Sequence, residues 1–236
     1  MVYLRNYIKI IIYLYVFIGF SFSNAQVFVN TGFDDFFRAI KSDDGAAVTR
    51  VIQKGFDGNT PYSNGNYGLI MAIHEERPAA VSALLAWDKV KVEVRNKADE
   101  SPLMMAALMG NTALVRRLIA MDADVNKPGW APLHYAATNG HAGIIQILLD
   151  GHAYIDASAP NGATPLMMAA EYGNIAAVKL LLDAGADASI KNRLGQTALD
   201  YAKRGSRPDA VALLGALAAT QAAQAKAAAS AASAAK

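Results

Sequence analysis

Apolar and polar positions recur along this chain with a period of 33 residues. The run from Ala131 to Ala137 (APLHYAA) returns as the run from Thr164 to Ala170 (TPLMMAA). A glycine and a second apolar run follow each copy, and within a copy the apolar residues keep helical spacing. A fixed period of this length indicates a repeat protein rather than one globular core.

Each copy predicts two short helices. Thr164 supplies an oxygen that can cap the first helix, and Pro165 suits the first helical position, where no N–H is needed. Gly173 and Gly185 end the first and the second helix. Two helices this short do not bury their apolar sides alone, so neighbouring copies must stack.

These motifs resemble the ankyrin repeat and its T-P-L-H-x-A signature. The resemblance implies an all-α solenoid of helix-turn-helix units joined by short β-hairpin loops, called fingers below. We expect six repeats including two caps, starting near residues 33, 66, 100, 130, 163 and 196, within a domain over residues 26–217. The first and last copies carry charge on their outer sides, as terminal repeats that face water should.

Three stretches depart from the regular pattern. Leu103 and Leu133 are only 30 residues apart, so the finger between them is short by three residues and should leave a notch. Residues 89–96 alternate valine with charged residues, which predicts a β-ribbon. Trp87 is expected to pack under the adjoining finger. The alanine-rich tail over residues 218–236 is expected to be either a frayed helix or disordered.

The first 25 residues predict an export signal. Arg5 and Lys9 precede an apolar run from Ile10 to Phe20, and small residues lead to an expected cleavage site after Ala25. The alternative is an uncleaved membrane anchor. The chain has no cysteine, which stacked repeats do not need, and a bacterial periplasm or cell exterior fits best.

Charge argues against general nucleic-acid binding. Without the leader the chain holds 20 basic and 20 acidic residues. The distribution is uneven, because the part from Lys191 onward has 7 basic and 2 acidic residues. We interpret this basic end as a solvated surface, with contact to a polyanion as the minor alternative.

No catalytic or metal-binding motif is found. The family resemblance implies structural roles for His134 and His141, and adjacent acidic pairs such as Asp34 and Asp35 diverge rather than converge across a cleft. We therefore predict no enzyme activity, no cofactor and no metal site.

The resemblance implies that a partner protein binds the concave side of the stack, which is made of fingers and first helices. Specificity should then lie in residues that vary between copies. At the ends of first helices these are Leu108, Met109, Thr138, Asn139, Glu171 and Tyr172; on the fingers they are Lys127, Trp130, Asn161, Arg193 and Leu194. Trp130, beside the short finger, either contacts the partner or packs across the notch.

The sequence thus predicts a monomeric exported module that sequesters or positions another protein. Two alternatives remain open, a membrane-tethered scaffold with an uncleaved leader and an immunity or inhibitor protein against a toxin or effector. The motif predicts the fold but leaves the partner open.

Overall fold

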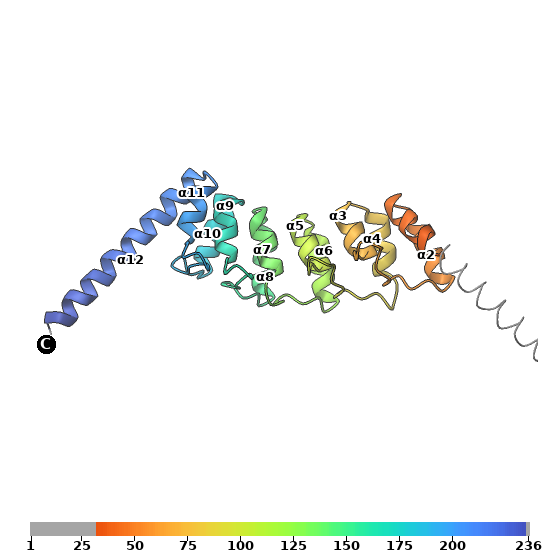
Figure 1. Ribbon diagram of the computed structural model, residues 1–236, viewed down its shortest axis with the longest axis horizontal. Coiled ribbons are helices and arrows are strands. Elements are labelled where there is room, and N and C mark those ends of the chain that lie inside the picture. Colours follow the sequence, from red (N-terminus) through yellow and green to blue (C-terminus); the bar gives the residue numbers. More distant parts are fainter. Residues whose placement is uncertain (1–31, 235–236) are drawn as a thin grey trace, which may run out of the picture. The chain divides into compact units, whose positions relative to one another are not determined.

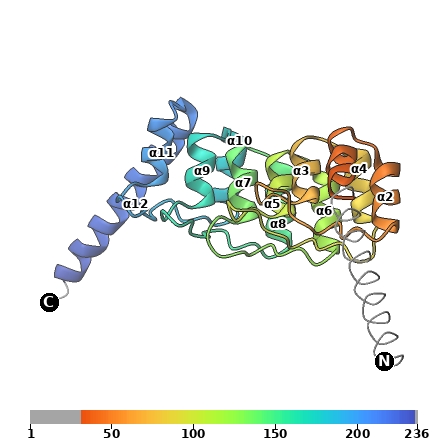
Figure 2. The ribbon, with the colours of Figure 1, turned by 45° about the vertical axis from the view of Figure 1, so that its right-hand side comes forward.

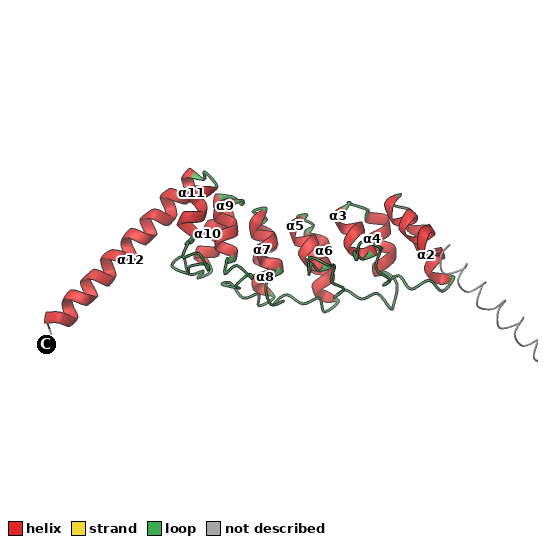
Figure 3. Cartoon of the chain, viewed as in Figure 1, coloured by secondary structure: helices red, strands yellow, loops and turns green. Residues whose placement is uncertain are grey.

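The computed structural model describes residues 32–234, with side-chain exposure through residue 230. The predicted leader and its cleavage site at Ala25 lie outside the described residues. The chain divides into two compact units, residues 1–91 and 92–236. In the described part there is no strand, and one isolated antiparallel bridge joins Pro61 and Tyr67 (Figure 3). No helix within residues 32–234 has the length and apolar character needed to cross a membrane.

The first unit contains the N-terminal cap and the second repeat. Helical residues 32–41 are followed by α2 (Gly45–Gln53), α3 (Gly68–His74) and α4 (Pro78–Leu85). Aromatic rings close the cap: Phe33 stacks on Tyr62 with ring centroids 5.7 Å apart, and Phe36 contacts Phe56 at 4.8 Å. The cap therefore buries large rings while its outer side keeps Asp34, Asp35 and Arg38 exposed.

Packing in the first unit explains two irregular residues. Gly68 occupies the slot that proline fills in later copies, and a Cβ there would lie 2.8 Å from Ile40 Cδ1 and 2.9 Å from Phe36 Cε1. The cap's large side chains therefore require glycine. Trp87 packs against the adjoining finger as predicted, because a Cβ on Gly58 would lie 3.0 Å from its ring.

The second unit is a regular stack of helix pairs. Its helices are α5 (Pro102–Leu108), α6 (Thr112–Ala120), α7 (Pro132–Thr138), α8 (Ala142–Asp150), α9 (Pro165–Glu171), α10 (Ile175–Asp183), α11 (Ala198–Arg204) and α12 (Pro208–Ala234). The first helices α5, α7, α9 and α11 pack side by side, and α6, α8 and α10 form a second row (Figure 1). Leu103, Leu133 and Leu166 are each 0% exposed, which confirms the predicted solenoid.

Helix starts follow the predicted cap chemistry. The Ser101 and Thr164 hydroxyls accept from the backbone N–H groups of Met104 and Met167 at 3.3 and 3.4 Å. Ala131 has no such hydroxyl, and its N–H donates to His134 Nδ1 at 3.1 Å instead. A cap of this kind satisfies N–H groups that the first helical turn leaves free.

Consecutive fingers are joined by a ladder of side-chain acceptors rather than by paired strands. In each finger a carbonyl or carboxylate oxygen accepts the backbone N–H of a residue in the next finger. Within the first unit the pair is Asn59 with Lys91 (2.9 Å); within the second unit the pairs are Glu93 with Asp124 (2.7 Å), Asn126 with Tyr154 (2.7 Å) and Asp156 with Asp187 (3.1 Å). The prediction of a β-ribbon over residues 89–96 was wrong, because this segment is a series of turns whose Glu93 carboxylate serves the ladder.

The C-terminal tail is helical. Of the two predicted alternatives, the structure has α12 continue without a break through residue 234, well past Leu214, which is 2% exposed (Figure 2). Residues 218–230 are exposed throughout. The stack therefore ends in a long helix that leaves its last finger behind.

Candidate protein-binding surface

The proline slot aligns the ends of the first helices of the second unit. Because α5, α7 and α9 begin at Pro102, Pro132 and Pro165 and have equal lengths, their last residues occupy equivalent places. These places hold the predicted pairs Leu108 and Met109, Thr138 and Asn139, and Glu171 and Tyr172. The structure brings all six to one end of the first-helix row.

Tyr172 is exposed there, whereas Glu171 is not. Tyr172 is 51% exposed, but Glu171 is 7% exposed and forms an ion pair with Arg204, whose Nε lies 2.7 Å from Glu171 Oε1. Arg204 also stacks 4.1 Å above the Tyr201 ring. Glu171 was predicted as a contact residue, and its burial corrects that prediction, since its carboxylate holds two repeats together.

The protonation of this pair follows from its contacts. Hydrogen bonds from Arg204 hold the pKa of Glu171 below its usual value, against the effect of burial. A hydrogen bond with the Glu171 carboxylate raises the pKa of Tyr172. Arg207 fixes the adjacent backbone, with Nε 3.1 Å from the Glu171 carbonyl and Nη2 2.9 Å from that of Tyr172. The Tyr172 ring is thus an exposed aromatic group on a rigid support.

The other helix ends are partly occupied by contacts between repeats. The exposed Asn139 donates from Nδ2 to the Leu108 carbonyl at 2.8 Å, and His141 Nε2 lies 3.0 Å from the same oxygen. Thr138 Oγ1 donates to the His134 carbonyl at 2.8 Å. Leu108, Met109 and Thr138 are half-buried, so they offer partial surfaces beside Asn139.

The short finger differs from its prediction at Lys127. This side chain is 6% exposed, forms an ion pair with Asp99, and donates to the carbonyls of Pro128 and Trp130. We therefore remove Lys127 from the candidate surface, because burial and these contacts dedicate its ammonium to the finger itself. Trp130 is half-buried, with the edge of its ring against His134 at a centroid distance of 5.3 Å.

The remaining predicted residues lie at exposed fingertips. The Arg193 N–H donates to the Asn161 carbonyl at 3.0 Å, so two consecutive tips touch. A Cβ on Gly162 would lie 2.9 Å from the Arg193 nitrogen, which is why this tip requires glycine. Asn161 and Arg193 are exposed, and Leu194 is 81% exposed.

One exposed aromatic residue was missed. Tyr154 is 68% exposed at the start of a finger, where the neighbouring fingers have Asp124 and Asp187. Aligning the copies would have found it, because an aromatic residue replaces an acidic one at a solvent-facing position. Tyr154, Tyr172 and Leu194 are the large hydrophobic side chains that the described residues expose.

Histidine contacts in the second unit are structural. His134 Nδ1 accepts from Ala131 N–H, so Nε2 carries the proton and donates to the Ala163 carbonyl at 3.1 Å. Burial lowers the pKa of His134 and keeps the ring neutral. Over residues 32–234, no group of three or more His, Cys, Asp or Glu side chains is arranged to hold a metal ion.

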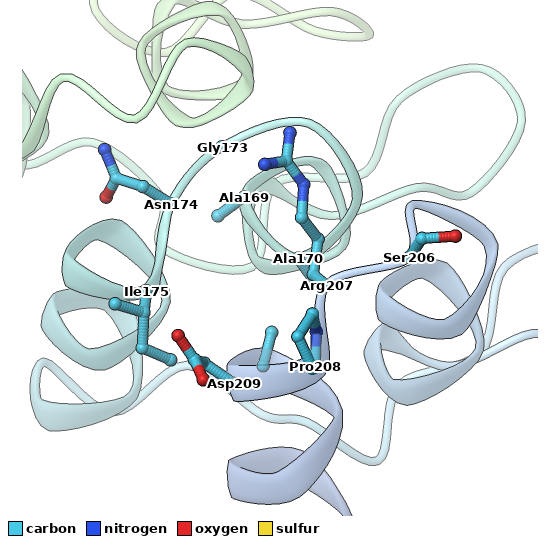
Figure 4. Close-up of a pocket in the computed structure, with 10 residues that line it drawn as sticks. Ala169, Ala170, Gly173, Asn174, Ile175, Ser206, Arg207, Pro208 and Asp209 are labelled. Atoms are coloured by element: carbon cyan, nitrogen blue, oxygen red, sulfur yellow. The ribbon is translucent and has the colours of Figure 1, made fainter.

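A cavity of about 300 Å³ lies between the α9–α10 turn and the α11–α12 turn (Figure 4). Asn174, Ile175, Arg207 and Asp209 line it with small residues. Asn174 donates to the Gly140 carbonyl and accepts from Ala177 N–H, and Arg207 holds two backbone carbonyls. These polar groups serve the joints between repeats.

Comparisons with known proteins agree with this architecture. A family model described as ankyrin repeats (3 copies) matches residues 36–127 and 69–159, and one described as ankyrin repeats (many copies) matches residues 150–202. The chain is 29% identical over 147 residues to neurogenic locus notch homolog protein 1 of Xenopus tropicalis, covering 59% of this chain and 6% of that protein. It is 32% identical over 125 residues to ankyrin repeat and SAM domain-containing protein 6 of Mus musculus, covering 49% of this chain and 14% of that protein. The chain thus spans a small part of these relatives.

A solved structure matches over nearly its whole length. It comes from the complex of a predatory endopeptidase from Bdellovibrio bacteriovorus with an immunity protein. The match has a TM-score of 0.66 and 30% sequence identity, and it covers 77% of this chain and 96% of the matched chain.

Proposed function

Because the chain belongs to the ankyrin-repeat family, we propose that it is an exported immunity-type protein that binds and sequesters one enzyme of the cell envelope. Ankyrin repeats are protein-binding modules, and the repeated frame leaves specificity to the residues that differ between copies. The proposal assigns the chain no catalytic step, no cofactor and no nucleic-acid ligand.

The likeness to the immunity complex carries this proposal. The matched chain is covered almost completely, at 96%, so the resemblance extends over a whole protein rather than one repeat. That complex contains an endopeptidase, and we propose an envelope peptidase as the partner class here. The predicted leader supports the same compartment, since a protein that restrains such an enzyme must meet it where it acts.

Exposed residues of the second unit supply the contact surface. Tyr172 and Leu194 are large, exposed and held by backbone contacts, and aromatic anchors of this kind dominate the energy of many interfaces. Asn139, Asn161 and Arg193 add polar contacts around them. A rigid surface loses little conformational entropy on binding, which favours tight association.

The test is capture followed by an activity assay. The full chain, tagged after a flexible C-terminal linker, is used to isolate partners from an envelope extract of its native host. We expect one peptidase at one-to-one stoichiometry, and we expect the purified chain to reduce its activity against purified cell wall. Binding of many unrelated proteins, or of a peptidase whose activity stays unchanged, would contradict the immunity role.

A further inference from the structure

A groove of about 450 Å³ lies between the last finger and α12. Its finger side is formed by Ala188, Ser189 and Lys191, and its helix side by Ala218, Gln221 and Ala222; Thr197, Leu199 and Leu214 complete it. The groove exists because α12 continues past the end of the stack as a helix instead of turning into another finger.

The groove occupies the place that a following repeat would fill. Leu199 is the equivalent of Leu133 and Leu166, which are 0% exposed because each is covered by the next repeat. With no later repeat in this chain to cover it, Leu199 stays partly exposed in the groove. An apolar side chain placed there would gain about 25 cal/mol per Å² buried.

The finger ladder indicates which kind of segment fits. In each earlier rung a side-chain oxygen accepts a backbone N–H from an extended segment, as Asn126 does from Tyr154 at 2.7 Å and Asp156 from Asp187 at 3.1 Å. Ser189 holds the equivalent position in the last finger and lines the groove. Its hydroxyl donates to Asp187 Oδ1 at 2.6 Å, which leaves the oxygen lone pairs available to accept.

Charge narrows the occupant further. Lys191 is the charged residue of the lining, which includes no carboxylate. The nearby Asp200 is held by Thr197, whose N–H and Oγ1 both lie 2.9 Å from Asp200 Oδ2. Lys191 is therefore free to meet a carboxylate from outside the chain.

We propose that this groove receives an extended segment of the partner protein, with an aliphatic side chain against Leu199 and Leu214 and a carboxylate against Lys191. A backbone N–H of that segment bonds to Ser189 Oγ, so the partner continues the finger ladder. The inference rests on the proposed protein-binding function and deepens it by specifying the partner's contacting segment.

Photo-crosslinking in the native host tests the site. The full chain carries p-benzoylphenylalanine in place of Ala222, which lines the groove, or of the matched Ala223, which is equally exposed on α12 but lies outside the lining. We expect a crosslink to one other protein at position 222 and none at 223. The crosslinked peptide, mapped by mass spectrometry, should carry aliphatic and acidic residues.

Three outcomes would overturn the inference. One is a crosslink between two copies of this chain, and another is equal crosslinking at both positions. The third is capture of a partner by the unmodified chain while position 222 stays silent and a probe at Asn139 reacts; this result leaves the proposed function standing. Failure to capture any partner counts against the proposed function itself.

Affinity measurements with the captured partner add a second test. Ala222→Arg places a bulky cation in the groove and should weaken binding at least tenfold, whereas Ala223→Arg should change it less than twofold. Lys191→Glu should also weaken binding at least tenfold, compared with the exposed Lys179→Glu on α10. Equal effects within either pair would refute the groove as the contact.

Discussion

The ammonium of Lys127 lies 3.5 Å from the backbone carbonyl oxygen of Trp130. The equivalent carbonyls in the neighbouring fingers accept a backbone N–H instead, from Asn96 to Glu100 (3.1 Å), from Ala159 to Ala163 (2.9 Å) and from Asn192 to Gln196 (2.9 Å). The short finger lacks the residues that would close its turn in this way. A lysine side chain therefore replaces a missing main-chain hydrogen bond.

Replacing this lysine should destabilise the second unit. We expect Lys127→Met to lower the free energy of unfolding by about 1 to 3 kcal/mol, because buried carbonyl oxygens lose their donor. Urea denaturation measures the loss. The exposed Lys97→Met on the preceding finger serves as the control and should cost less than about 0.5 kcal/mol. Equal losses in the two variants would show that the ammonium of Lys127 closes nothing.

The Glu171–Arg204 pair should make stability depend on acid. The pKa of Glu171 is lowered in the fold, so its contribution is complete above the ordinary carboxyl value of about 4.3 and is lost as pH falls through the lowered pKa. Glu171→Gln should therefore be less stable than the natural chain at pH 7 and approach it at pH 2 to 3. Urea denaturation at both pH values checks this, and a gap of constant size would contradict it.

His134 should add a second pH dependence at higher pH. Because burial lowers its pKa, the unfolded chain binds a proton that the native chain does not, so stability falls as pH drops below about 6.5. Met104 and Met167 fill the same slot in neighbouring copies, so His134→Met keeps a side chain that the slot accepts. We expect this variant to lose less stability than the natural chain between pH 7 and 5; parallel curves would argue against the assignment.

Partner capture should depend on the exposed anchors. We expect Tyr172→Ala and Leu194→Ala each to weaken binding of the captured partner by about 2 kcal/mol while leaving the helical circular dichroism unchanged. Gln146→Ala, on the exposed side of α8, is the control for a surface change elsewhere. If the two variants bind as well as the natural chain, the partner docks on another face.

Export should remove the leader. We expect N-terminal sequencing of the protein from its host to give a mature start at Gln26. The charged n-region would then be absent from the working protein, leaving equal numbers of basic and acidic residues. A start at Met1, together with recovery in the membrane fraction, would favour the tethered scaffold.

Much of the fold follows from short-range signals, and much of the candidate surface does not. Ser101 and Thr164 cap their helices as the sequence predicts, because a cap depends on residues only three positions apart. Glu171 and Lys127 vary between copies just as Tyr172 does, yet both are buried against charged partners. Variation marks a position as free of the repeat frame but does not show whether a neighbouring copy has covered it.

The sequence by itself determined the period, the helix pairs and the row of buried leucines, since each repeat encodes its own caps, turns and apolar side. Only the tertiary structure decided how consecutive copies meet: that Glu93 serves the finger ladder instead of a β-ribbon, that Lys127 closes the short finger, and that α12 leaves an open groove. These contacts join residues about 30 positions apart, or depend on what the next copy lacks. Local patterning carries no information on such distances, and packing between copies decides them.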